Sequence, residues 1–127
     1  MIRPIAYRGE LRLLVYAVVS GGASPAQDFV NGLDVRDRAK VLKLFQMLGD
    51  GGTIRNKEKF KIIEGTKFYE FKSRQIRIPC YQDGLVWILT HGFIKKDDRI
   101  DPEQIRRAER IRGEDELICK TGSKKGK

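Results

Sequence analysis

A single histidine and several nearby cations are the residues in this sequence best suited to chemistry. His91 lies near the end of an apolar run that Lys95 and Lys96 follow, and Arg74 and Arg77 lie around the preceding strand-like segment. RNA cleavage needs such groups. A base takes the proton of the ribose 2′-OH, an acid protonates the departing 5′-oxygen, and cations stabilise the charge on the phosphoryl oxygens. The pattern predicts catalytic roles for His91, Arg77, Lys95 and Arg74.

The same residues have a structural interpretation, which stays open at this point. A histidine at the end of a strand is often a hydrogen-bonded structural residue, and a lysine pair in a loop is usually solvated. Glu70 is able to pair with Lys72, Arg74 or Arg77 across a sheet, which would make part of the basic patch an ion-pair network.

Most other kinds of site are excluded by residue type and spacing. His91 is the only histidine, and Cys80 and Cys119 have no partners at the spacing of metal ligands. The glycines of Gly49–Gly52 follow a predicted helix instead of a strand, which is typical of a helix end and not of a phosphate loop. We therefore expect no metal and no other cofactor.

The distribution of charge favours a polyanionic partner. The chain carries 26 Lys and Arg against 17 Asp and Glu, a net charge of +9, and the excess lies in residues 55–77 and in the lysines of residues 120–127. Such a local excess of positive charge is typical of nucleic-acid binding, although many basic domains have no binding partner and their charge serves solubility alone. The residues predicted to contact RNA phosphates are Lys59, Lys61, Lys67, Lys72 and Lys96.

One apolar run resembles a targeting signal but is too short. Leu13–Val19 holds seven apolar residues, far below the roughly 20 that span a bilayer, and it is rich in strand-forming side chains. We interpret it as part of a buried strand and expect no membrane association and a cytoplasmic protein.

Hydrophobic periodicity, caps and turns predict a strand, two helices, three strands and a last helix. The capping signals are Ser24 with Pro25, Asp34, and Asp101 with Pro102, and Pro79 predicts an edge position or a bulge. The elements are a strand over Leu11–Val19, helices from Ser24 to Asn31 and from Asp34 to Gly49, a lead-in over Lys57–Glu64, strands over Phe68–Ser73, Gln75–Gln82 and Leu85–Phe93, and a helix from Asp101 to about Arg112.

This order predicts an α+β fold with the helices on one face of an antiparallel sheet. The length allows one domain. We assign residues 1–115 to that domain and predict that residues 116–127 form a basic, disordered tail.

The segment Lys67–Arg112 resembles the RelE/ParE toxin superfamily, and in particular its phage-derived, HigB-like branch. The residues that carry the resemblance are the Phe68-Tyr69-Glu70-Phe71 strand, Arg77 in the next strand, and the run His91-Gly92-Phe93-Ile94-Lys95-Lys96 before a proline-initiated helix.

The resemblance implies a fold, an activity and a partner. The implied fold has two N-terminal helices packed on a four-stranded antiparallel sheet, of mixed type at its edge, with a C-terminal helix. RelE-like members are ribosome-dependent mRNA endonucleases held inactive by an antitoxin, here expected to be a helix-turn-helix protein. Arg77 matches the arginine near the scissile phosphate, Lys95 and Lys96 match the basic residues after the last strand, and His91 matches the histidine of this branch. Residues 101–127 contain no tyrosine to match the catalytic tyrosine of RelE, so proton transfer falls to His91 or a lysine.

Two other functions remain open. ParE shares this fold and inhibits DNA gyrase by binding, without catalysis. A degenerate domain that only binds its antitoxin or nucleic acid is the other alternative. The oligomeric state is open as well.

Overall fold

One mixed sheet organises the part of the chain that the computed structural model describes, residues 2–97 and 101–125, with side chains up to residue 119. The strand order is β1-β2-β6-β5-β4-β3, and the short β7 pairs with β5 beyond the end of β6. β2 and β6 are parallel, and the other neighbours are antiparallel. The seven strands are β1 (Ile5–Arg8), β2 (Leu13–Tyr16), β3 (Phe60–Ile62), β4 (Tyr69–Ser73), β5 (Ile76–Asp83), β6 (Val86–Leu89) and β7 (Phe93–Ile94).

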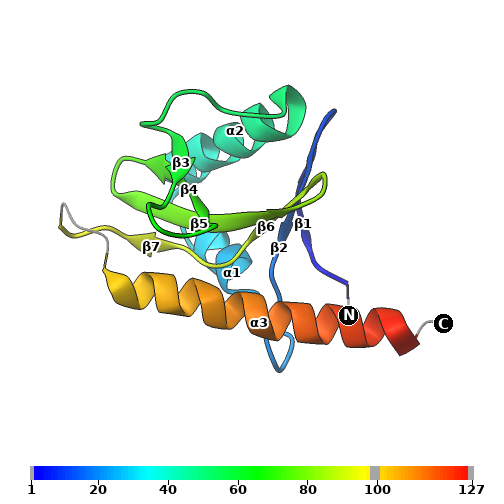
Figure 1. Cartoon of the computed structure of the whole chain (residues 1–127). Coiled ribbons are helices and arrows are strands. Elements are labelled where there is room, and N and C mark those ends of the chain that lie inside the picture. The colour runs from blue at the N-terminus through cyan, green and yellow to red at the C-terminus, as the bar shows by residue number, and fades with distance from the viewer. Residues whose placement is uncertain (1, 98–100, 126–127) are drawn as a thin grey trace.

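Helices cover both faces of this sheet (Figure 1). α1 (Pro25–Asn31) and α2 (Val35–Gly51) lie on one face, where Phe45 of α2 packs edge-on against Phe71 of β4. α3 (Pro102–Lys125) lies on the other face, where its Ala108 and Ile111 form a second core with residues of β2, β5 and β6. The sheet is therefore the middle layer of three.

The bounds of α2 follow from local signals that the sequence shows. The Asp34 carboxylate accepts a hydrogen bond of 2.8 Å from the Asp37 N–H, as an N-cap does. Gly52 ends the helix in the left-handed region, at φ 82°, where a side chain would be strained. The predicted start of this helix is confirmed, and its end lies within the predicted Gly49–Gly52 segment, two residues past Gly49.

The predicted fold class is wrong in its sheet and in its helix arrangement. The sheet has seven strands in the described residues instead of four, its parallel pair β2–β6 is internal and not at an edge, and two strands precede α1. The helices lie on both faces instead of one, because both faces of the sheet are apolar.

The apolar run Leu11–Val19 yields only the four-residue β2. The turn from β1 through Gly9 delays the start of the strand to Leu13, and after Tyr16 the N–H groups of Val18 and Val19 bond to Asp115 and to the Ala23 carbonyl instead of to a strand. The short edge strands β1 and β3 carry too few residues to show a clear alternation.

The predicted strand Leu85–Phe93 is divided into β6 and β7, with Thr90, His91 and Gly92 between them. Pro79 lies opposite this break and belongs to an inner strand, so its predicted edge position is wrong. The Pro79 carbonyl accepts a hydrogen bond of 2.9 Å from the Thr90 N–H, in the break between β6 and β7. The nitrogen of a strand residue points to the same side as its carbonyl, so the Pro79 nitrogen also faces this break. The missing proline N–H therefore costs no regular ladder bond.

A buried carboxylate ties α3 to the N-terminal segment. Asp115 is 0% exposed, and its Oδ1 accepts from Arg3 Nη2 at 2.6 Å and from Arg3 Nε at 2.9 Å. Its Oδ2 accepts from the Val18 N–H at 2.8 Å. α3 extends past the predicted end at Arg112, to Lys125. The division of the chain into a domain and a tail after residue 115 stays a prediction. None of the helices in the described residues has an apolar stretch long enough to cross a bilayer.

Candidate functional site

Strand register brings four cations together on the face of the sheet that carries α3. Lys72 of β4 pairs with Arg77 of β5, and Arg77 pairs in turn with Phe93 of β7. Lys95 follows β7 and donates its N–H to the Gln75 carbonyl at 2.7 Å. Lys61 of the edge strand β3 completes the group. We call Lys61, Lys72, Arg77 and Lys95 the basic cluster.

Electrostatic repulsion within the basic cluster shows in the pKa of Lys72. Partial burial lowers this pKa, and the charges of Lys61, Arg77 and Lys95 lower it further. The carboxylate of Glu70 opposes the shift, because it lies on the same face of β4 and favours the charged amine. The cluster is therefore a site of positive electrostatic potential, and a bound anion would reduce the repulsion among its cations.

Arg77 is the most constrained cation of the cluster. Its side chain is 8% exposed, and Nη1 donates to the carbonyls of Arg74 at 2.7 Å and Ile76 at 2.9 Å. Its Nε is buried and has no hydrogen-bond partner among the described residues. A buried N–H without an acceptor costs about 1–3 kcal/mol, so a bound anion that accepts from it is stabilised.

Glu70 adds a carboxylate to this face. It is 6% exposed and stands opposite Lys61 in the register of β3 and β4. In the described part of the chain its side chain forms no hydrogen bond or close ion pair, although the sequence allowed pairing with Lys72, Arg74 or Arg77. Glu70 is therefore available as a proton acceptor next to the cations.

His91 lies beneath the surface, not on it. Its ring is 0% exposed, with Nδ1 3.0 Å from Thr90 Oγ1 and Nε2 3.0 Å from Gln104 Oε1 of α3. The ring stacks on Phe93 at 5.7 Å between centroids. Because Phe93 pairs with Arg77, His91 supports the strand beside the basic cluster. Direct contact with a substrate, as the predicted catalytic role requires, would need movement of these partners.

Burial also fixes the charge state of His91. Burial lowers the pKa of the imidazole to about 4. The hydrogen bond that Gln104 Oε1 accepts opposes this shift, and the charges of Arg107 and Arg110 add a smaller contribution to it. In the unfolded chain the pKa is near 6.5. The unfolded state thus binds more protons between these two values, and the stability of the fold rises with pH there.

We therefore expect acid sensitivity that depends on His91. The imidazole contributes its full stability above about pH 6.5, and about 3 kcal/mol of it is lost as the pH falls to about 4. Urea unfolding across this range measures the effect. His91→Gln, which cannot be protonated, should flatten the profile. Equal slopes for both proteins would contradict the expectation.

The glycine after His91 is explained by packing. A Cβ on Gly92 would lie 2.1 Å from Cδ2 of Phe29 in α1, far inside van der Waals contact. The position therefore brings the β6–β7 connection against α1, and nothing larger than glycine fits there.

Arg74 forms the β4–β5 turn with φ 57°, the only described non-glycine residue in the left-handed region. Its side chain lines a hollow of about 520 Å³ on the α2 side, together with Lys40 and Lys43 of α2 and with Lys59 and Lys72. The turn therefore places Arg74 at the end of the basic cluster, next to the predicted phosphate contact Lys59.

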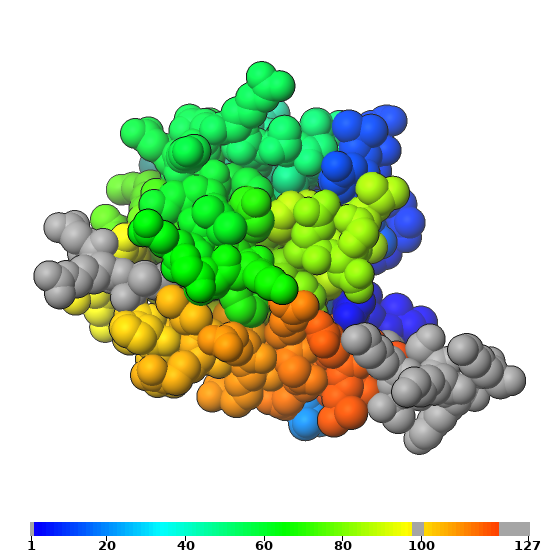
Figure 2. Space-filling model, in the orientation of Figure 1, coloured from blue at the N-terminus to red at the C-terminus, as the bar shows by residue number. Residues whose placement is uncertain are grey.

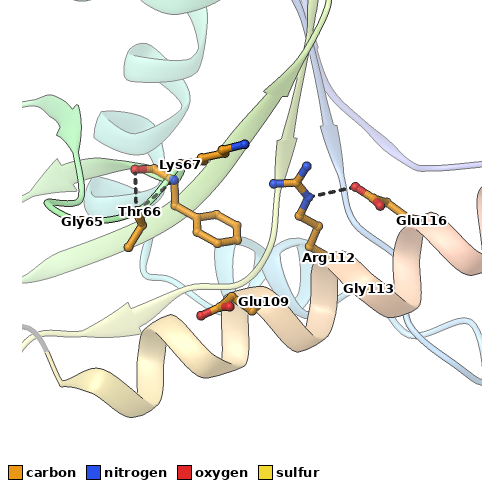
Figure 3. A pocket seen from close by; sticks show the side chains of 8 residues that line it. Gly65, Thr66, Lys67, Glu109, Arg112, Gly113 and Glu116 are labelled. Atoms are coloured by element: carbon orange, nitrogen blue, oxygen red, sulfur yellow. Dashed lines mark hydrogen bonds and ion pairs between the residues drawn. The ribbon is translucent and has the colours of Figure 1, made fainter.

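Lys67 and Lys96 lie apart from the basic cluster. Lys67 lines a hollow of about 580 Å³ between the β3–β4 turn and α3, which meet on the face shown in Figure 2. Across that hollow Arg112 pairs with Glu116 at 2.8 Å (Figure 3). Arg112 also covers the Tyr81 ring, at 4.4 Å from its centroid. Lys96 lines a smaller hollow with Lys95, at the start of α3.

A comparison with known families identifies the family of this chain. Residues 28–112, which make up more than half of the sequence, match the family described as phage derived protein Gp49-like (DUF891). The chain belongs to the Gp49-like family. This family is associated with toxins of toxin–antitoxin systems of the RelE-like type, which suggests an antitoxin as partner. No curated protein matched the chain.

The part of the chain that matches the Gp49-like family contains the whole basic cluster, Glu70 and His91. It leaves out β1 and β2, and also Asp115 in the later half of α3. Membership in the HigB-like branch stays a prediction.

Sequence reasoning missed Gln104 as a partner of the site. The sequence identified it only as a capping residue of the last helix, whereas its amide oxygen holds His91. No sequence signal predicts this contact, because it depends on the path of the connection between β7 and α3. Glu70 was noticed for its charge, but its lack of a close partner was visible only in the structure.

Proposed function

We propose that this Gp49-like protein is the toxin of a toxin–antitoxin system and cleaves mRNA on the ribosome by attack of a ribose 2′-OH, without a metal. The observation that supports this most is Arg77. Its guanidinium is held by two carbonyls within the basic cluster and keeps a buried N–H without an acceptor. A phosphate of the RNA backbone supplies the acceptor and the negative charge that this site favours.

The roles of the side chains follow from their positions. Arg77 and Lys95 stabilise the charge that develops on the phosphoryl oxygens. Lys72, whose pKa is lowered by burial and by its cationic neighbours, protonates the departing 5′-oxygen. Glu70 accepts the proton of the 2′-OH, since its carboxylate lies on the same face. His91 acts as a positioning residue through Phe93.

The remaining predicted cations act on the RNA backbone away from the cleaved bond. Lys59 and Arg74 line the hollow next to Lys72, so they extend the basic cluster toward α2. Lys61 contacts the backbone from the edge of the cluster, on β3, and Lys67 and Lys96 lie farther from it, in the hollows beside α3. These contacts contribute affinity that decreases with salt and carries no sequence preference.

Inducible expression in bacteria with mapping of mRNA 5′ ends within minutes tests the proposal. We expect new ends inside translated codons for the wild type and for Arg36→Ala, an exposed arginine of α2, but not for Lys72→Ala. Growth arrest without new ends would contradict the proposal and would favour a non-enzymatic, gyrase-type inhibitor.

A further inference from the structure

A hollow of about 630 Å³ lies at the edge strand β3, apart from the residues to which we assign the chemistry. It is formed by β3, by Tyr69 of β4 and by the connection that follows α2, and Phe60 and Ile62 contribute apolar surface. β3 has a neighbour on one side only, so the hollow is open along the edge of the sheet. Its volume is that of an ordinary small-ligand site.

Aromatic rings form one wall of this hollow and are held in fixed orientation. Phe60 and Tyr69 are stacked, with centroids 5.2 Å apart and planes at 15°. Trp87 of β6 meets both rings edge-on, at 5.2 Å from Tyr69 and 5.4 Å from Phe60. Tyr69 is half-buried and lines the hollow. A ring that is already fixed loses little entropy when a planar ligand stacks on it.

Cations surround the aromatic wall. Arg55, Lys57 and Lys61 line the hollow and are exposed, against a single acidic residue, Glu64. Their side chains form no hydrogen bond or ion pair within the described residues. Aromatic rings beside unpaired cations are the combination that binds single-stranded nucleic acid, because bases stack on the rings and phosphates contact the cations.

Lys61 connects this hollow to the basic cluster. Lys61 lines the hollow, and its charge also lowers the pKa of Lys72. Lys61 pairs with Glu70 of β4, and Lys72 is two residues farther along the same strand. Phe60 and Tyr69 lie on the face of the sheet that carries α2, whereas Lys61 and the rest of the basic cluster lie on the face that carries α3. Because β3 is the edge strand, a single strand of RNA that passes around this edge at Lys61 reaches both places.

We propose that the hollow at β3 binds an unpaired base of the same RNA strand whose phosphate is held by the basic cluster on the other face of the sheet. Tyr69 stacks on the base, and Arg55 and Lys57 contact the adjoining phosphates. This inference rests on the proposed function and adds to it a base-binding subsite. The subsite would give the toxin a preference for the base at one position near the cleaved bond.

Binding of a short single-stranded RNA with 2′-O-methyl groups, which cannot be cleaved, and with one 2-aminopurine tests the subsite. Tyr69→Leu should weaken binding about 5- to 150-fold and abolish the quenching of 2-aminopurine, because stacking is worth about 1–3 kcal/mol per base. Tyr69→Phe, which keeps the ring, should bind and quench as the wild type does. Circular dichroism checks that both variants are folded.

The double variant Arg55→Ala/Lys57→Ala keeps the aromatic wall and covers the case in which Tyr69→Leu fails to fold. It should reduce the slope of log affinity against log salt by about 1.4, since each phosphate contact on a single strand contributes about 0.7. The matched control, Arg8→Ala/Arg36→Ala, removes two exposed arginines of β1 and α2 and should leave the slope unchanged. Wild-type affinity, quenching and salt slope in the variants of the hollow would overturn the inference.

The outcome is separable from that of the proposed function. If the wild type cleaves mRNA on ribosomes while the variants of the hollow bind RNA normally, only the subsite is wrong. If the wild type binds the oligonucleotide but cleaves no mRNA, the nuclease proposal is wrong.

Discussion

Replacing Arg77 with alanine is expected to slow mRNA cleavage about 10²–10³-fold, the usual cost of removing one fixed donor to a developing oxyanion. The guanidinium is held by the carbonyls of Arg74 and Ile76, so no other cation of the cluster is fixed in the same way. A single-turnover cleavage assay on ribosomes programmed with a defined mRNA measures the rate.

Two further variants separate charge from geometry. Arg77→Lys keeps the charge but loses the forked contacts to the two carbonyls, so its rate should lie between those of the wild type and Arg77→Ala. Arg36→Ala removes an exposed arginine from α2 and should leave the rate unchanged. A rate for Arg77→Ala within a factor of about two of the wild type, with the melting temperature preserved, would remove Arg77 from the mechanism.

Replacing Asp115 with alanine is expected to lower the free energy of unfolding by about 3–5 kcal/mol. The carboxylate is fully buried, and its loss leaves the Arg3 guanidinium and the Val18 N–H without their acceptor. The Tyr81 hydroxyl, 3.5 Å from Oδ1, loses its contact as well. Urea unfolding followed by circular dichroism measures the change.

A surface pair provides the control for this variant. Glu103 accepts from Arg106 at 2.8 Å on the exposed side of α3, and Glu103→Ala should cost less than about 1 kcal/mol. Asp115→Asn keeps the size of the side chain and should fall between the two. If Asp115→Ala cost no more than Glu103→Ala, the buried carboxylate would not be what fastens α3 to the N-terminal segment.

Local signals in the sequence predicted the starts of the three helices, the end of α2 and the central hairpin, but not the end of α3. Asp34 and Gly52 mark the ends of α2 through contacts within a few residues, and Gly84 in the β5–β6 turn has the positive φ, 63°, that the Asp83-Gly84 pair indicates. Alternation along β4 and β5 also placed Lys72 and Arg77 on the face opposite Phe71 and Ile78. These features depend on short stretches of chain.

Features that depend on distant contacts were not predictable in the same way. The parallel pairing of β2 with β6 joins residues far apart in the chain, and no pattern within either strand announces it. Lys61 and Lys95 join the cluster only through the register of β3 and the path after β7. The burial of His91 likewise depends on Gln104, because α3 folds back over the end of β6.

The chemical nature of the RNA ends tests the central claim most directly. Purified protein is added to ribosomes programmed with a defined mRNA, and the ends of both fragments are analysed. Attack by the 2′-OH predicts a 2′,3′-cyclic phosphate on the upstream fragment and a 5′-hydroxyl on the downstream fragment, both absent with Arg77→Ala. A 5′-phosphate on the downstream fragment, or no cleavage by the wild type, would contradict the account.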